Sequence, residues 1–237
     1  MRLSKRIYAI ADAVNKGETA ADIGTDHGYV PMLLIKNAVS PRVIMSDISE
    51  GSLAKAVETF KLCGLEADPE DFRTGDGLDT IEPGEVDTVI IAGLGGHTIA
   101  DILTADINKS MSFKRLILQP RKHSGNLRYA LYTNGWDISD EILAPEGKFV
   151  CEIICAVPGA DISPGQLREA PYPEEDIRWK YPETIVKADR ELAAKRIAWK
   201  TGSISEEIDN LKRSSHDRDD LIRKLEADRD YLEELIR

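Results

Sequence analysis

Two kinds of hydrophobic pattern alternate along the first 136 residues of the chain. Short runs of apolar, β-branched residues recur at regular intervals, and the segments between them carry apolar residues at helical spacing. The runs are residues 19–24, 42–47, 71–76, 86–93 and 115–120, and the clearest helical segments are residues 3–17, 52–64 and 97–106. Because this alternation is typical of parallel strands joined by crossover helices, we predict an α/β fold with a doubly wound sheet.

The pattern changes after residue 136, where two strand-like runs follow each other closely. Residues 137–144 and 148–157 are joined by a short loop that contains Gly147, which predicts an antiparallel hairpin. The sheet is therefore expected to have five parallel units closed by this hairpin. In the first helical segment, Ser4 is the N-cap candidate and Gly17 the stop signal.

The last third of the chain combines a proline-rich connection with helical segments. Five prolines and two glycines between residues 158 and 182 predict an irregular connection over the surface. Residues 201–207 then interrupt the helical pattern, with Ser203 and Glu206 as a capping box. The face expected before this interruption carries Ile185, Ala188, Leu192 and Trp199.

Steps of three and four separate the apolar residues of the final segment, which are Ile204, Ile208, Leu211, Ile222, Leu225, Leu232 and Ile236. Ser215, Arg218 and Arg229 occupy seam positions between them, so the coiled-coil pattern is imperfect. We predict a helical hairpin that pairs within the chain, rather than one that dimerises or grips a partner. The expected domains are residues 1–160 and 161–237, in a monomer or a weak dimer formed through the C-terminal helices.

The composition of the 237 residues, with 42% hydrophobic and 31% charged residues, is that of a globular protein. No apolar segment reaches the roughly 18 residues that a membrane-spanning helix needs, so we expect a cytoplasmic protein without a membrane partner. Cys63, Cys151 and Cys155 form neither an even set nor a C-x-x-C pair, which indicates neither disulfides nor a metal site. Cys151 and Cys155 alternate with apolar residues and are expected in the core.

The net charge of −11 argues at first against a nucleic-acid partner, but the charge is unevenly distributed. Residues 107–136 contain six basic residues and no Asp or Glu; they are Lys109, Lys114, Arg115, Arg121, Lys122 and Arg128. This segment either faces a polyanion or is an ordinary solvated surface, and its charge alone does not choose between the two.

The loop ADIGTDHGYVP, residues 21–31, follows the first predicted strand and resembles a nucleotide-binding loop with an acid in place of a glycine. Asp26 would repel a phosphate at about 4 Å by up to ~4 kcal/mol and attract a cation equally. The loop therefore favours a nucleoside that is positively charged near Asp26. S-adenosyl-L-methionine, which carries a sulfonium, meets that requirement.

Further acids follow the next two predicted strands. Asp47 is placed to accept hydrogen bonds from ribose hydroxyls, and Asp76 to receive an adenine amine beside the N–H of Gly77. Each has an ordinary alternative as a turn or N-cap residue. The fourth strand ends in AGLGG, residues 92–96, which lacks the Pro-Pro-aromatic motif of many amine methyltransferases. Its glycines leave either an open floor for a planar base or simply a tight turn.

Together, LSKRI, ADIGTDHGY, GDGL, IIAGLGG and RLILQP, in this order and followed by a helical tail, resemble the bacterial TrmK family of tRNA (adenine-N1) methyltransferases, which modify adenine 22. The resemblance implies a class I Rossmann-like methyltransferase domain, S-adenosyl-L-methionine as donor, and a coiled-coil domain that assists tRNA binding. It also implies that Asp26 is the catalytic aspartate.

Residue by residue, the expected site has three parts. The donor site contains Asp22, Gly24, Asp26, His27, Gly28, Asp47, Ile48, Gly75, Asp76, Gly77, Ala92 and Gly93. The pocket for the target base contains Tyr29, Gly95, Gly96, Gln119 and Pro120, and the tRNA contacts are Arg2, Lys5, Arg6, Arg121, Lys122 and Arg128. For His27, a structural hydrogen bond at the start of a helix is the alternative to lining the pocket.

In this hypothesis, Asp26 either holds the adenine through its N6 amine or stabilises the charge that develops on the ring. Three other functions remain open. A methyltransferase for a small molecule, a protein or another RNA would use the same loop. An NAD-dependent oxidoreductase is disfavoured by Asp26 and the missing G-x-G-x-x-G motif. A non-enzymatic scaffold is disfavoured by the intact loop acids.

Overall fold

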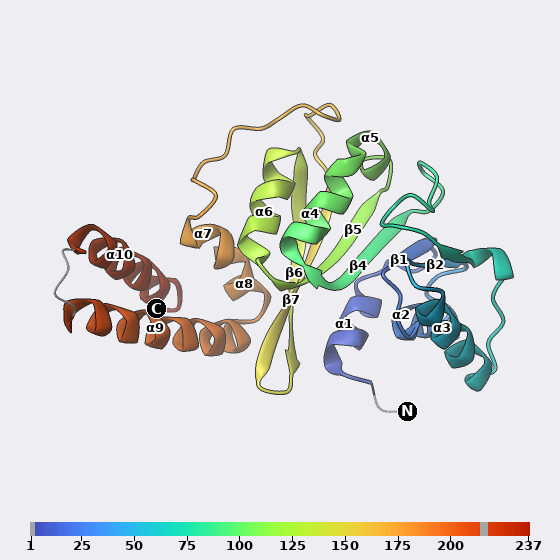
Figure 1. Cartoon of the computed structure of the whole chain (residues 1–237), viewed down its shortest axis with the longest axis horizontal. Coiled ribbons are helices and arrows are strands. Elements are labelled where there is room, and N and C mark those ends of the chain that lie inside the picture. Colours follow the sequence, from blue (N-terminus) through green and yellow to red (C-terminus); the bar gives the residue numbers. More distant parts are fainter. Residues whose placement is uncertain (1–2, 214–217) are drawn as a thin grey trace.

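A computed structural model describes residues 3–213 and 218–237, and its centre is a seven-stranded sheet (Figure 1). The strands lie in the order β3-β2-β1-β4-β5-β7-β6. They are β1 (Ala20–Ile23), β2 (Val43–Asp47), β3 (Phe72–Thr74), β4 (Thr88–Gly95), β5 (Arg115–Lys122), β6 (Trp136–Glu146) and β7 (Phe149–Pro158). The first five strands pair in parallel, and β7 enters antiparallel to β5 and β6. The predicted α/β sheet of five parallel units closed by a hairpin is confirmed.

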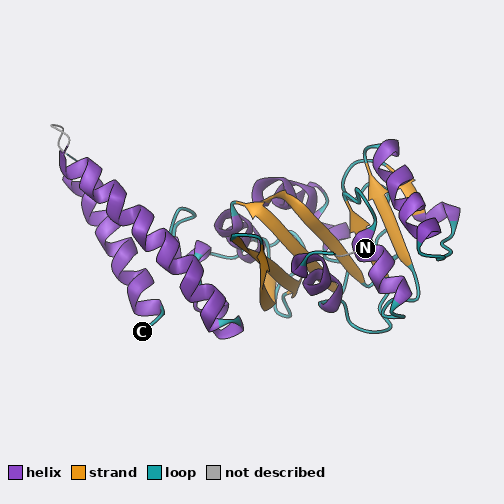
Figure 2. Ribbon diagram, turned by 90° about the horizontal axis from the view of Figure 1, so that it is seen from below, coloured by secondary structure: helices purple, strands orange, loops and turns teal. Residues whose placement is uncertain are grey.

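Helices cover both faces of this sheet (Figure 2). One face carries α1 (Lys5–Asp12), α2 (Tyr29–Lys36) and α3 (Glu50–Leu62), and the other carries α4 (Gly96–Ala105), α5 (Ile107–Ser110) and α6 (Ser124–Thr133). Ala20 packs with the first group and Ala21 with the second, because successive strand residues point to opposite faces. Burial on both faces explains why the central strands β1, β2, β4 and β5 contain apolar runs. A short 3₁₀ turn, η1 (Pro69–Asp71), leads into β3.

The C-terminal region begins with α7 (Ile177–Lys180) and α8 (Glu183–Ala188) and continues into α9 (Arg190–Arg213) and α10 (Asp219–Leu235). The last two helices pack side by side and extend away from the sheet (Figure 1). Their shared core is the predicted apolar set, with Ile204, Ile208 and Leu225 buried. Leu143 and Val150 of the β6–β7 hairpin join the same cluster, so the tail is attached to the sheet through that hairpin. The boundary between residues 160 and 161 stays a prediction.

Two details of the predicted tail are wrong. Residues 201–207 do not interrupt the helix, because α9 runs unbroken from Arg190 to Arg213. Ile197 and Ile204 are both fully buried on one face, and a continuous helix keeps them in register. Trp199 is not on that face, since its side chain is 75% exposed. Ser215 lies outside the described residues.

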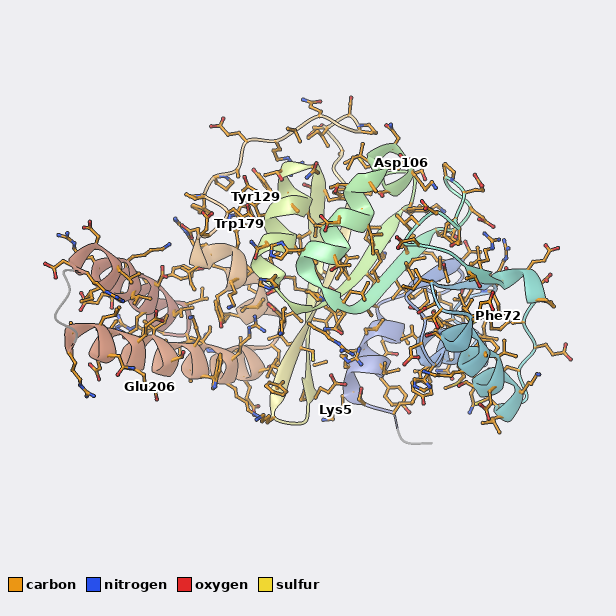
Figure 3. The ribbon with its side chains drawn as sticks, viewed as in Figure 1. Lys5, Phe72, Asp106, Tyr129, Trp179 and Glu206 are labelled. Atoms are coloured by element: carbon orange, nitrogen blue, oxygen red, sulfur yellow. The ribbon has the colours of Figure 1, made fainter. Side chains whose placement is uncertain are left out.

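The junction between sheet and tail is aromatic. Trp179 of α7 packs edge-on against Tyr129 of α6 with ring centroids 5.7 Å apart, and Figure 3 shows the two side chains together there. The indole N–H of Trp179 donates to the carbonyl of Pro173, 3.0 Å away. The contact of Trp179 with Tyr129 fixes the end of the proline-rich connection against α6.

Other predictions for the first helix and the cysteines have mixed outcomes. Helix α1 ends at Asp12, earlier than expected, and Ser4 holds the N-cap position without a side-chain capping bond. Cys155 is buried as predicted, whereas Cys151 is half-buried. Within residues 3–213 and 218–237, no group of three potential metal ligands and no helix capable of crossing a membrane is found.

Candidate active site

The carboxyl ends of the parallel strands meet at one edge of the sheet, below β4 and β5 in Figure 1. The segments there are residues 24–28 after β1, 47–49 at the end of β2, 75–77 after β3, 92–96 at the end of β4 and 120–123 at the end of β5. Gly24 and Leu94 are close: a Cβ placed on Gly24 would lie 3.9 Å from Cδ1 of Leu94. The predicted donor loop and the glycine-rich floor are therefore neighbours, as expected at the topological switch point of such sheets.

Glycines in the loop after β1 determine its path. Gly24 has φ +79°, and its N–H donates to the carbonyl of Ser46 on β2 at 2.8 Å. Gly28 has φ +65° and packs so closely on α3 that a Cβ there would lie 2.8 Å from Cβ of Ala56. Both positions thus need glycine for conformation or space, independently of any phosphate.

Asp22 is buried at the end of β1, with 8% of its surface exposed. Thr25 donates its hydroxyl to the Asp22 carboxylate. Burial raises the pKa of Asp22 to about 7, against the lowering effect of the Thr25 hydrogen bond, and the charge of Asp47 raises it further. A cationic ligand at this edge would stabilise the ionised carboxylate.

This raised pKa predicts a pH-dependent stability difference between the wild type and Asp22→Asn. Between about pH 4 and pH 7, the folded protein holds a proton that the unfolded chain has released, so the free energy of unfolding of the wild type falls as the pH rises. The Asp22→Asn variant has no such titration. Its free energy of unfolding should therefore rise relative to that of the wild type by up to about 4 kcal/mol across that range. Thermal unfolding from pH 4.5 to 8.5 measures this gap, which is the difference in the free energy of unfolding between the two proteins. A gap that is constant with pH would contradict the raised pKa.

Asp26 lies beyond Asp22 in the same loop, and its side chain is 55% exposed. Lys55 Nζ donates to Oδ1 at 2.7 Å, and His27 Nε2 lies 3.2 Å from Oδ2. The Lys55 hydrogen bond lowers the pKa of Asp26 below its ordinary value. The His27 ring stacks on Tyr29, with centroids 5.1 Å apart. The loop therefore presents an ionised carboxylate at the edge of the site.

The ends of β2 and β3 suit an adenosine. Asp47 accepts the N–H of Ser49 at 2.8 Å through Oδ1, which leaves its other oxygen for a ribose hydroxyl. The next residue, Ile48, is 72% exposed and could pack on the face of the adenine. Asp76 is exposed, and Gly77 beside it has φ +49°. These groups fit a nucleoside donor with a cationic centre near Asp22 and Asp26.

On the acceptor side, β4 and β5 end in a glycine floor beside cationic and aromatic groups. A Cβ on Gly93 would lie 3.7 Å from Nε of Arg121, so that guanidinium lies over the floor. A Cβ on Gly96 would lie 2.1 Å from the carbonyl oxygen of His123, which only glycine permits. His123 itself has the left-handed φ of 59°, and its ring lies 4.5 Å from that of His97. Sequence reasoning missed this histidine pair, although each histidine follows its strand at the start of a helix.

Several expected contacts are placed differently by the structure. Gln119 is 2% exposed; its carbonyl accepts Arg6 Nη1 at 3.0 Å, and its amide donates to the Pro120 carbonyl. Gln119 therefore does not line an open base pocket, and Pro120 is buried beside it. Arg6 is also paired with Glu146 at 2.9 Å, with 17% of its side chain exposed.

The prediction that Arg128 contacts tRNA is wrong, because its side chain is 1% exposed and bound to Glu141 and Glu152. Lys5, Arg121 and Lys122 are exposed, as a phosphate contact requires, and Arg2 lies outside the described residues. The basic surface at the site is therefore smaller than the sequence suggested.

Taken together, the strand order and the acids at successive strand ends define a class I methyltransferase. Residues 3–154 match the family model described as a methyltransferase domain, so the chain belongs to that family. A tRNA (adenine(22)-N(1))-methyltransferase from Bacillus subtilis (strain 168) is 36% identical over 159 residues, which are 67% of this chain and 66% of the relative.

Solved structures extend the similarity to the whole chain. The B. subtilis m1A22 tRNA methyltransferase TrmK is 26% identical, with a TM-score of 0.81 over 100% of this chain and 99% of that one. The fold is also that of M. capricolum TrmK in complex with S-adenosyl-homocysteine, which is 20% identical with a TM-score of 0.74 over the full length of both chains. The predicted resemblance is confirmed, and the chain is a member of the TrmK family.

Proposed function

We propose that this protein transfers a methyl group from S-adenosyl-L-methionine to N1 of adenine 22 in tRNA. The observation that supports the proposal is an exposed carboxylate, Asp26, in a loop after β1 whose Gly24 lies against Leu94 of the glycine-rich end of β4. The B. subtilis relative, named for this activity, supports the substrate. That match spans about two thirds of the relative's length, 66%, and the fold extends the similarity to the tail.

The donor would be held by the loops at the ends of β1, β2 and β3. Asp47 would bind the ribose, Ile48 would pack on the adenine, and Asp22 would lie near the cationic end. When bound, the donor supplies an activated methyl group on a sulfonium. The protein itself supplies orientation, since a correctly aligned nucleophile and methyl group remove much of the barrier.

The adenine N1 lone pair forms the new N–CH₃ bond while the electron pair of the broken S–CH₃ bond stays on sulfur. No proton leaves N1, so a strong base is unnecessary, and the positive charge moves from the donor to the adenine ring. Asp26 would hold the N6 amine or stabilise that charge. Because N1 lies on the Watson–Crick edge, adenine 22 must leave its pairing to enter the site.

A small-molecule or protein acceptor is the main alternative and would use the same donor site. Arg121 and Lys122 favour RNA, because both are exposed at the acceptor edge, and Arg121 lies over Gly93. A tRNA-modifying enzyme is expected in the cytoplasm. We infer that it acts as a monomer, because α9 and α10 already bury their apolar faces against each other.

The direct test incubates the protein with labelled donor and an unmodified tRNA transcript, followed by mass spectrometry of the nucleosides. We expect 1-methyladenosine, and none when adenine 22 of the transcript is replaced by guanine. Label in another nucleoside, or equal label in both transcripts, would contradict the assignment.

Exposed cations at the acceptor edge also predict a salt-dependent affinity. Arg121→Ala should weaken tRNA binding about tenfold at low salt and reduce the slope of log affinity against log salt by about 1, as expected for one lost phosphate contact. Lys16→Ala is the matched control, because Lys16 is exposed just before β1, at the opposite edge of the sheet. Filter binding at 50–300 mM salt measures the tRNA affinity and its salt dependence for the wild type and both variants. Equal slopes for wild type and Arg121→Ala would remove Arg121 from the tRNA contact.

A further inference from the structure

The Asp26 carboxylate is held by a lysine that the sequence motifs do not indicate. Lys55 projects from α3, and its Nζ lies 2.7 Å from Oδ1 of Asp26. The two side chains are 50% and 55% exposed. Ion pairs this exposed contribute little to folding stability, so fold stability does not explain the contact.

The same turn of α3 also holds the loop by its backbone. Gly28 packs against Ala56, the neighbour of Lys55, so closely that any Cβ would clash at 2.8 Å. The start of α3 is in turn fixed by Ser49, whose hydroxyl accepts the N–H of Ser52. Because α3 begins at Glu50, three residues after Asp47, one helix connects the end of β2 with the loop that carries Asp26.

We propose that Lys55 is a positioning residue for methyl transfer, which fixes Oδ1 of Asp26 and leaves Oδ2 for the adenine. This inference rests on the proposed function. On the Oδ2 side lies the 44% exposed His27, whose Nε2 is 3.2 Å from Oδ2, so the proposal requires the base to displace this ring from the carboxylate. Lys55 does not touch the reacting atoms in this arrangement and acts through Asp26.

The pair also lowers the pH at which Asp26 takes up a proton. A hydrogen bond from Lys55 is the first cause of the lowered pKa of Asp26, and His27 and Ser52 add to it. Without Lys55, the carboxylate would take up a proton at higher pH and would also lose its fixed orientation. Loss of Lys55 should therefore harm catalysis most at acidic pH, and a purely structural role would not produce that dependence.

The test compares Lys55→Ala, Lys55→Arg and the control Lys61→Ala, which removes an exposed lysine from the same helix. We expect Lys55→Ala to lower kcat about tenfold to a hundredfold, to move the acidic limb of the kcat–pH profile to higher pH, and to leave donor Kd unchanged. Lys55→Arg should have most of the wild-type activity and the same acidic limb of the kcat–pH profile as the wild type. Lys61→Ala should match the wild type in kcat and in its pH profile. Melting temperatures of all three should stay near that of the wild type.

Two results would overturn the proposal: wild-type kcat for Lys55→Ala at every pH, or an equal loss at every pH that arginine does not rescue. Failure of the proposed function looks different, because the wild type itself would then form no 1-methyladenosine.

Discussion

Replacing Asp26 with alanine is expected to lower the rate of methyl transfer about 10²- to 10³-fold, the usual cost of losing one preorganised electrostatic group. The side chain is half-exposed and its pKa is lowered, so an ionised carboxylate is open to an incoming base, and we expect its removal to affect the acceptor more than the donor. Single-turnover assays with labelled donor measure the rate, and calorimetry measures donor Kd. Donor binding should survive, since Asp22 and Asp47 remain.

Asp26→Asn separates the two roles proposed for this carboxylate. The amide keeps a hydrogen-bond acceptor for the N6 amine but removes the charge, so near-normal activity indicates orientation and a loss equal to alanine indicates charge stabilisation. Asp12→Ala, an exposed acid at the end of α1, is the control and should behave as the wild type. An active Asp26→Ala enzyme would remove Asp26 from the catalytic machinery.

The sheet could be predicted from the sequence because its central strands β1, β2, β4 and β5 are buried on both faces and contain apolar runs between helical segments. The tail was harder to predict. The stretch 201–207 contains a glycine, a capping-box pair and little apolar surface, which locally predict a break, yet packing of Ile204 on the tail core keeps α9 intact. Tertiary contacts override such local signals.

The same contrast between local sequence signals and tertiary contacts holds for the residues of the site. That Asp22, Asp26 and Asp47 lie at one edge of the sheet could be predicted, because each is at or just after the end of a parallel strand and such ends meet. Lys55 could not be predicted, because it reaches Asp26 across 29 positions and from the side of a helix. Arg128 failed as a predicted tRNA contact for a related reason: an acid-free stretch of sequence says nothing about acids brought to it from β6 and β7.

The buried pairing of Arg128 predicts the largest effect on stability. Its guanidinium donates to Glu141 at 2.7 Å, to Glu152 at 2.8 Å and to the carbonyl of Trp179 at 3.1 Å. Arg128→Met would leave Glu141 buried without this cation, whereas Glu152 keeps Arg196 at 2.7 Å. Breaking such a buried pair costs about 3–5 kcal/mol, which corresponds to a melting temperature roughly 10 °C lower in a chain of this size.

Two comparisons test why Arg128→Met is expected to be less stable than the wild type. Burial alone would raise the pKa of Glu152, but Arg128 and Arg196 hold it below its ordinary value, so the stability it contributes is present above about pH 4.5 and lost at lower pH. The deficit of Arg128→Met should therefore narrow as the pH falls toward 4, and adding Glu141→Gln should recover part of it at pH 7. Arg223→Met, at an arginine side chain 73% exposed in α10, is the control and should change little. A deficit below about 1 kcal/mol at pH 7 would show that the buried carboxylates do not depend on Arg128.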